Sequence, residues 1–227
     1  MYQNSGCCTP PNRKQDNCNC KDGILCALDW FYQDCLLSGN ACLKDIKYYP
    51  QLPSIYDFNV DEPISNTIYN IPYITQDIVP IYTSTPISEP YTGNITYLNV
   101  CKIDGFEFKI RDGCSATRIE SDICIRFSKI SFCSPSSNCC KNGTMEFLLK
   151  AKDFLLNLPT TATQYVTLST STKSYRATQI LAINNDTVWF KDTCTFDSCD
   201  SAFAGTTYYV LSLCELIGIT FNRVSAP

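Results

Sequence analysis

The chain has 227 residues, of which 44% are apolar, so it is long enough and apolar enough to bury a sizeable core. Charged residues make up 18%, the formal net charge is -4, and lysine and arginine form no run, which argues against nucleic acid and anionic membranes as partners. The chain contains no histidine, which excludes Ser-His and Cys-His catalysis and histidine-bound zinc, haem and copper.

Sixteen of the 227 residues are cysteine, which is about 7% of the chain. Such a density is usual in small secreted domains that lack a core, and this chain has enough apolar sequence to need no such help. The thiols are therefore expected either to bind metal or to become oxidised once the protein has left a reducing cell.

Residues 1–21 contain Cys7, Cys8, Cys18 and Cys20 and almost no other apolar side chain. A segment that cannot bury itself does not fold alone, so these thiols are placed to reach another surface. Adjacent cysteines rarely bond to each other because their Cβ vectors diverge, and the neighbouring Pro-Pro pair favours an extended course. We predict that residues 1–21 form a crosslinking arm.

A secretory signal is not expected, because residues 1–20 are polar throughout and a signal needs an apolar stretch of roughly 7 to 15 residues. The longest apolar run, Ile24–Tyr32, is interrupted by Asp29 and is shorter than the ~20 residues that span a bilayer. We therefore expect synthesis in the cytoplasm without a signal peptide. A signal removed ahead of Met1 is the alternative.

Residues 22–37 carry the one clear helix pattern of the chain. Ile24, Leu28 and Phe31 recur at helical spacing, and Asp22 can cap the first turn. The apolar face is wider than one stripe, which predicts that the helix packs on a sheet or on a neighbouring subunit. In the segment 22–42, three cysteines lie on or just beyond the helix, where they either form disulfides or fill its apolar face: Cys26, Cys35 and Cys42.

Residues 43–96 contain no cysteine and are rich in proline, tyrosine and isoleucine. Seven of the twelve prolines and eight of the fourteen tyrosines fall between Tyr48 and Tyr97. Proline favours extended backbone, and the interleaved apolar side chains need a surface to cover them. We call this segment the belt. It is predicted to run over a neighbouring subunit or to fill a groove or, alternatively, to form a long irregular excursion over its own domain.

The remaining residues, 97–227, are predicted to form a body of antiparallel strands, because short alternating apolar runs are separated by turn signals. The fold class is therefore mainly β: an antiparallel β-sandwich or jelly-roll-like body with one N-terminal helix and an extended Pro/Tyr-rich segment. Met145–Leu158 fits either a helix or a strand. The turn signals are Asp104-Gly105, Asp112-Gly113 and Asn184-Asn185-Asp186. The expected strands are 97–103, 106–111, 123–130, 164–169, 175–183, 187–191 and 207–220.

Zinc is the main alternative to disulfides for the thiols. Structural four-cysteine sites use pairs separated by roughly two to four residues, most characteristically as CxxC. No CxxC is present in this chain. This spacing favours disulfides, so no metal site and no cofactor is predicted. The nearest approaches to a metal-binding spacing are Cys7-Cys8, Cys18-Asn19-Cys20, Cys139-Cys140 and the pair Cys194 and Cys199.

The chain carries no catalytic motif of the common kinds. GxGxxG, GxxxxGK[ST] and GxSxG are absent, and the carboxylates Asp61 and Glu62 are adjacent rather than placed across a cleft. Matches to the N-x-T glycosylation pattern at Asn94, Asn142 and Asn185 are of the kind that a chain rich in Thr and Asn produces by chance. We predict that the protein is not an enzyme.

In the arm, nine residues separate Cys18 from the Cys7-Cys8 pair, and the β body is rich in threonine. With the absence of histidine, this pattern resembles the self-assembling cysteine-rich proteins of bacterial endospore surfaces, including appendage-fibre subunits and exosporium lattice proteins. The stretch from Cys26 to Cys35 is similar to the Cys-bracketed helix that opens some spore crust and exosporium proteins. The resemblance implies that Cys7, Cys8 and Cys18 bond to cysteines on a neighbour's jelly-roll, and that the protein leaves the mother cell on lysis.

We therefore predict a structural subunit that self-assembles into a disulfide-crosslinked fibre or two-dimensional lattice on the endospore surface. Its partners are expected to be copies of itself and other spore-surface proteins, with no nucleic acid and no membrane. The alternatives are a zinc-thiolate scaffold and a secreted disulfide-rich adhesin or binding module. The candidates for disulfides between subunits are Cys7, Cys8, Cys18, Cys20, Cys139 and Cys140. The other disulfide candidates are Cys26, Cys35, Cys42, Cys101, Cys114, Cys124, Cys133, Cys194, Cys199 and Cys214.

Overall fold

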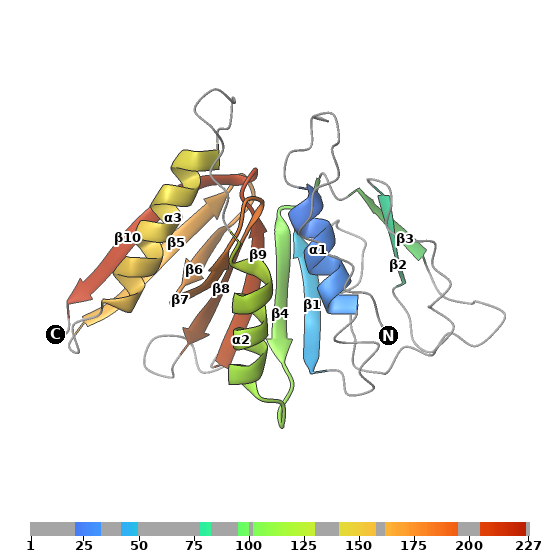
Figure 1. Cartoon of the computed structure of the whole chain (residues 1–227), viewed down its shortest axis with the longest axis horizontal. Coiled ribbons are helices and arrows are strands. Elements are labelled where there is room, and N and C mark those ends of the chain that lie inside the picture. Colours follow the sequence, from blue (N-terminus) through green and yellow to red (C-terminus); the bar gives the residue numbers. More distant parts are fainter. Residues whose placement is uncertain are drawn as a thin grey trace.

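The strands that the structure describes all pair antiparallel (Figure 1). The predicted mainly β, antiparallel fold class is therefore confirmed. The computed structural model describes residues 21–32, 42–49, 78–82, 95–99, 102–129, 141–157, 162–194 and 205–225. The helices are α1 (Lys21–Tyr32), α2 (Ala116–Phe127) and α3 (Lys141–Leu156). The strands are β1 (Leu43–Tyr49), β2 (Ile78–Tyr82), β3 (Ile95–Asn99), β4 (Gly105–Ile110), β5 (Ala162–Thr170), β6 (Ser174–Ala177), β7 (Gln179–Ile183), β8 (Thr187–Cys194), β9 (Gly205–Ser212) and β10 (Leu216–Ser225).

Two sheets build the body. The larger sheet has the strand order β1-β4-β9-β8-β7, the smaller has the order β10-β5-β6, and β2 pairs with β3 in a third, two-stranded sheet. The first two sheets are joined where β6 runs into β7, and at this junction the backbone N–H of Thr178 donates to the carbonyl of Lys191. They pack face to face, since one apolar cluster takes residues from both.

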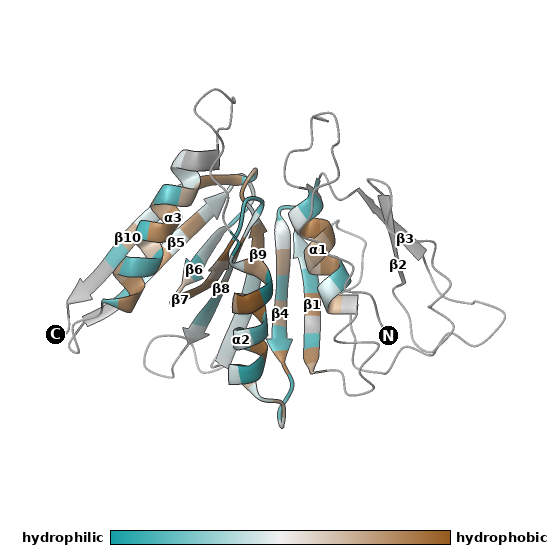
Figure 2. Cartoon of the chain, in the orientation of Figure 1, coloured by the Kyte–Doolittle hydropathy of each residue, from teal (hydrophilic) through white to brown (hydrophobic). Residues whose placement is uncertain are grey.

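Helices α1 and α2 cover one face of the larger sheet through aromatic side chains. Trp30 of α1 meets Trp189 of β8 edge to face at 5.4 Å, and Phe127 of α2 stacks on Trp189 at 4.3 Å. Phe31 of α1 packs against Phe108 of β4 at 5.2 Å. Figure 2 shows hydrophobic residues recurring along β1, β4 and β9, beside these helices. The apolar face predicted for the N-terminal helix therefore packs on a sheet of its own chain.

The other face of the larger sheet is covered by the smaller sheet and α3. Alternate residues of β9 contribute to the apolar clusters on the two faces of the sheet. Tyr208 and Val210 belong to the cluster with α1 and α2, whereas Tyr209 and Leu211 belong to the cluster with α3. Because successive side chains of a strand point to opposite faces, this alternation means that the sheet is buried on both sides.

Helix α1 begins one residue before the predicted start. Its Gly23 allows a close approach to the turn between β7 and β8, because a Cβ at this position would lie 2.4 Å from the Cβ of Asp186. That turn is the predicted Asn-Asn-Asp turn. Asn184 Oδ1 accepts hydrogen bonds there from the backbone N–H groups of Asp186 and Thr187.

The predicted strand at 123–130 is wrong, because residues up to Phe127 belong to α2. Ser115 caps this helix with its side-chain oxygen. The alternation of Ile123, Ile125 and Phe127 suggested a strand, yet Ile125 is 74% exposed, while Ile123 and Phe127 are buried. Burial at a spacing of four residues is the helical pattern, and the cap fixes where it starts.

The predicted hairpin between 97–103 and 106–111 is also wrong. Strand β3 ends at Asn99 and pairs with β2, whereas β4 pairs with β1 and β9. Gly105, expected in the turn, is the first residue of β4, where an added Cβ would lie 2.1 Å from the carbonyl oxygen of Val210. This glycine is required by the close approach of two strands rather than by a turn.

The second half of the chain follows the predictions more closely. Strands β5 and β8 contain the predicted strands 164–169 and 187–191. The predicted strand 175–183 is divided between β6 and β7, and 207–220 is divided between β9 and β10 by a turn at residues 213–215. The stretch that fitted either a helix or a strand forms most of α3.

Two predicted segments fall largely outside the described residues. Only the last residue of the arm, Lys21, is described. Of the belt, residues 43–96, the described parts are β1, β2 and the first two residues of β3. Strand β1 lies beside β4 in the larger sheet of its own chain.

Candidate crosslinking sites

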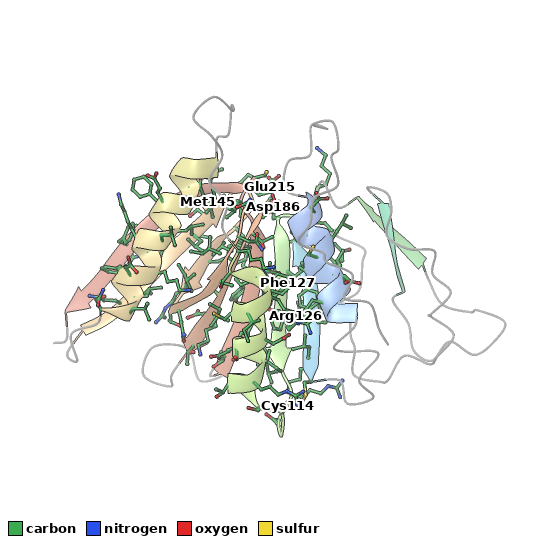
Figure 3. All side chains as sticks on the ribbon, viewed as in Figure 1. Cys114, Arg126, Phe127, Met145, Asp186 and Glu215 are labelled. Atoms are coloured by element: carbon green, nitrogen blue, oxygen red, sulfur yellow. A yellow bond between two sulfur atoms is a disulfide. The ribbon has the colours of Figure 1, made fainter. Side chains whose placement is uncertain are left out.

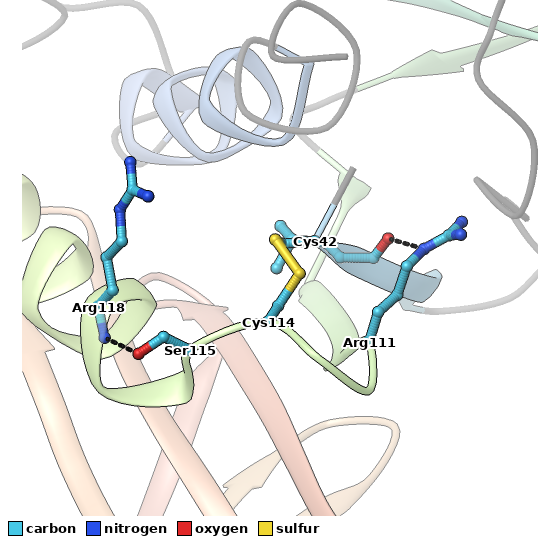
Figure 4. Close-up of a disulfide and its surroundings, with 6 residues drawn as sticks. Cys42, Arg111, Cys114, Ser115 and Arg118 are labelled. Atoms are coloured by element: carbon cyan, nitrogen blue, oxygen red, sulfur yellow. Dashed lines mark hydrogen bonds between the residues drawn. A yellow bond between two sulfur atoms is a disulfide. The ribbon is translucent and has the colours of Figure 1, made fainter. Parts of the chain in front are cut away.

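One disulfide lies wholly within the described residues and joins Cys42 to Cys114 (Figure 4). Cys42 directly precedes β1, and Cys114 lies between β4 and α2. Their Cα atoms are 5.7 Å apart, as a disulfide requires. Beside the bond, the backbone N–H of Arg111 donates to the carbonyl of Cys42 at 2.8 Å, and its Nε donates to the carbonyl of Leu43 at 3.4 Å. This candidate pair therefore forms a bond within one chain.

The Cys42–Cys114 disulfide encloses the belt. The two cysteines are 72 residues apart in sequence, and residues 43–96 lie entirely between them. Closing a loop of this length stabilises the folded chain by about 4 kcal/mol, chiefly because the unfolded chain loses conformational freedom. The bond also fixes the start of β1 against the start of α2.

Cys124 presents a free thiol on the exposed side of α2. Its sulfur lies 3.7 Å from Ser128 Oγ, one helical turn further along the chain. The next residue, Ile125, is one of the most exposed large apolar side chains of the described residues. The outer surface of α2 therefore combines an accessible thiol with an unburied apolar side chain.

Two carboxylates hold α2 against the rest of the body. Glu120 accepts hydrogen bonds from Lys191 Nζ at 2.7 Å and from the Tyr208 hydroxyl at 2.8 Å. Asp122 accepts one from Trp30 Nε1 at 2.8 Å. These contacts reach β8, β9 and α1, so the helix that carries the Cys124 thiol is fixed against the body.

The other described cysteines occupy several settings. Cys214, in the turn between β9 and β10, is disulfide-bonded. Cys26 is half-buried beside the aromatic cluster of α1, and Cys194 is the last residue of β8. Within the described part of the chain, no group of three or more Cys, Asp or Glu residues is placed to hold a metal ion. The ten other candidates lie outside the described residues, and their roles stay predictions: Cys7, Cys8, Cys18, Cys20, Cys35, Cys101, Cys133, Cys139, Cys140 and Cys199.

A buried polar network lies at the opposite end of the body from the disulfide. Figure 3 shows Glu215 at this end and Cys114 at the other. Asp104 is only 4% exposed, and its carboxylate accepts hydrogen bonds from the hydroxyls of Thr170 and Thr172. These bonds connect the start of β4 to the turn between β5 and β6. The sequence did not predict this network, because Asp104 stood in an apparent hairpin turn.

A group of tyrosines continues the network between the two sheets. The Tyr49 hydroxyl donates to Glu107 Oε2 at 2.5 Å, and Lys173 Nζ donates to the Tyr49 hydroxyl at 3.1 Å. Burial raises the pKa of Tyr49, and the bond to Glu107 raises it further. Burial also raises the pKa of Tyr175 and of Tyr209, which pack edge to face at 5.5 Å.

Alkaline titration is expected to show two classes of tyrosine. Tyrosines of the unfolded chain lose their protons near the ordinary pKa of 10.0, whereas the buried tyrosines of the folded chain have raised pKa values. The buried tyrosines therefore contribute their full stabilisation below pH 10.0, and this stabilisation is lost as the pH rises above 10.0. Tyr49, Tyr175, Tyr208 and Tyr209 should therefore ionise only as the protein unfolds. The exposed tyrosines should ionise in a first step without a change in circular dichroism. The buried tyrosines should ionise in a second step at higher pH, in which tyrosinate absorbance and circular dichroism change together.

The urea-unfolded chain is the control for this titration and should ionise in one step near pH 10.0. One step in the folded chain, with unchanged circular dichroism, would contradict the buried setting of these tyrosines.

Comparison with protein-family models, with curated proteins and with solved structures finds no match for this chain. Among the helices that the structure describes, none has both the length and the apolar character needed to cross a membrane. The function has to be inferred from the cysteines and surfaces of the molecule itself.

Proposed function

We propose that this chain is a structural subunit that assembles with copies of itself and is crosslinked by disulfides between copies. The observation that carries the proposal is the free, exposed thiol of Cys124, on a helix held in place by Glu120 and Asp122. The same body keeps Cys42 and Cys114 in an intrachain bond. Its cysteines thus include pairs that stabilise the fold and a thiol that remains for another molecule.

The chemistry of crosslinking fits a protein that is made in a reducing cell and matures outside it. Each crosslink joins two thiols into one disulfide and releases two protons and two electrons, which molecular oxygen accepts. Subunits made in the cytoplasm would stay reduced until lysis exposes them to oxygen. The endospore surface meets both conditions, and the resemblance of the arm to spore-surface proteins supports a fibre or lattice at that location.

Chemical and mechanical resistance would be the purpose of such an assembly. A non-covalent contact remains in equilibrium with free subunits, whereas a disulfide between copies prevents dissociation until it is reduced. Within each subunit, the Cys42–Cys114 bond and the aromatic core around Trp189 oppose unfolding. Both levels of stabilisation favour a coat or appendage component over a transient binding module.

Non-reducing electrophoresis with intact mass measurement of the oxidised full chain tests the proposal. We expect a ladder of multimers that collapses to monomer on reduction, and Cys124→Ser should weaken this ladder. The matched control is Cys26→Ser, at a half-buried position on α1, which should leave the ladder unchanged.

Monomer alone in the oxidised sample would overturn the proposal and favour a secreted binding module. Release of bound metal on thiol titration would overturn it in favour of a zinc-thiolate scaffold.

A further inference from the structure

Strand β10 forms an outer edge of the smaller sheet. It pairs with β5 from Leu216 opposite Thr170 to Ser225 opposite Ala162. The order β10-β5-β6 leaves its other side without a neighbouring strand among the described residues. Figure 1 shows β10 at the outer side of the body, away from α1 and α2. A row of backbone donors and acceptors from this ten-residue strand therefore faces outward.

Strand β10 lacks most of the features that protect exposed sheet edges. Natural edge strands are usually short, charged or interrupted by proline. The sequence of β10 has no proline and a single charged residue, Arg223, and its one irregularity is a bulge near its start. Ile217 is 72% exposed and Phe221 is 40% exposed. This edge is therefore open to pairing with a further strand.

Two phenylalanines of α3, Phe147 and Phe154, lie on the side of the helix that faces β10, with Lys150 Nζ 5.0 Å from the centre of the Phe147 ring. Phe154 of α3 meets Phe221 of β10 edge to face at 5.3 Å. Phe147 is seven residues earlier, about two helical turns, so it lies on the same side of α3 and is 52% exposed. Leu156 is 65% exposed but lies about two and a half turns from Phe147, on the opposite side of the helix.

We infer that β10 pairs antiparallel with β10 of a second copy, so that the two smaller sheets become one continuous sheet. Twofold pairing matches this strand with one of equal length and equal apolar content. Neighbouring strands lie about 4.8 Å apart. Since α3 contacts both β5 and β10, the two α3 helices would lie about 10 Å apart, a distance at which helices pack. The Phe147 side chains of both copies would then be covered.

Charge and proline content favour a second β10 over β1 or β2 as the partner. With the twofold axis at Thr220, position 223 of one copy pairs with position 217 of the second copy, so the single charged residue of each β10 strand is opposite an isoleucine and no like charges are opposed between the two strands. Strand β1 would instead bring Lys44 and Lys47 to the same edge, and β2 contains a proline. The inference rests on the proposed self-assembly, for which it supplies a non-covalent contact that forms before oxidation.

Analytical ultracentrifugation of the full chain in a thiol reductant tests this contact, because disulfides between copies cannot form there. The protein is expected to sediment as a concentration-dependent dimer. Phe147→Glu and Ile217→Lys should each raise the dimer dissociation constant at least about ten-fold, since each places a charge in the buried contact. Leu156→Glu is the matched control on the other side of α3 and should dimerise like the unaltered chain. Circular dichroism checks that each variant is folded.

A monomer at every concentration, or a dimer that Phe147→Glu and Ile217→Lys leave intact, would overturn the inference. Hydrogen exchange gives a second readout: protection of the β10 amides should rise with protein concentration, and unchanged protection would count against the pairing. If the protein is a monomer under reducing conditions but still forms the ladder when oxidised, the β10 contact is contradicted and the crosslinking function stands. If it is a dimer under reducing conditions but gives no ladder when oxidised, the crosslinking function is contradicted and the β10 contact stands.

Discussion

Replacing Cys7 and Cys8 together with serine is expected to abolish boiling-resistant multimers while leaving the body folded. Adjacent thiols cannot readily bond to each other, so each is available to a different partner. The described disulfide between Cys42 and Cys114 does not involve the arm. Circular dichroism measures the fold of the double variant, and non-reducing electrophoresis measures its multimers.

The matched control for the arm replaces Ser5 and Thr9 with alanine, which alters the same segment and keeps both thiols. This control should form multimers like the unaltered chain. Multimers that persist in the double serine variant would show that the arm is not the crosslinker. The thiols of the body, beginning with Cys124, would then be the residues to replace.

Gly105→Ala is expected to lower the free energy of unfolding by about 3 kcal/mol or more, the upper part of the range for overpacked positions. The added Cβ would lie 2.1 Å from the carbonyl oxygen of Val210 and 2.9 Å from the Cα of Leu211. Both are backbone atoms of β9, so no side-chain movement can relieve the clash and β4 has to separate from β9. Urea unfolding measured by tryptophan fluorescence reports the loss, because Trp30 and Trp189 are buried in the core.

Gly218→Ala is the control for this substitution, because it makes the same chemical change in a strand where space is available. Its Cβ would meet only the Cβ of Ser169, at 3.7 Å, which is an ordinary contact. The control should unfold within about 1 kcal/mol of the unaltered chain. Equal urea midpoints for the Gly105 and Gly218 variants would show that β4 and β9 are not packed as closely as described.

Local patterns predicted much of the secondary structure. The helical spacing of Ile24, Leu28 and Phe31 placed α1, and alternation with turn residues placed β5 and β8. These signals depend on neighbours in sequence, so they can be read without knowledge of the fold.

The elements that were missed depend on contacts between distant residues. An Asp-Gly pair usually marks a turn, but Gly105 serves the approach of β4 to β9. In α2, the alternation of apolar residues competed with a helical spacing, and the helical form stacks Phe127 on Trp189 of β8. The sequence of residues 116–127 alone does not predict that contact.

The sequence identified which cysteines could form disulfides but not which two cysteines form each bond. Sequence marks which residues carry thiols, whereas pairing depends on which Cα atoms the fold brings within reach, as for Cys42 and Cys114. The network around Asp104 had no recognisable signal, because its partners Thr170 and Thr172 lie more than sixty residues away in sequence.

The loop closed by Cys42 and Cys114 has a consequence for proteolysis. A protease that cuts once within the belt leaves two fragments that each keep one of these cysteines, so they remain joined through the disulfide. If the belt reaches a neighbouring subunit, it leaves its own body and returns to it as a closed ring. A single cut would then open the ring without detaching either fragment, and release would require reduction as well as cleavage.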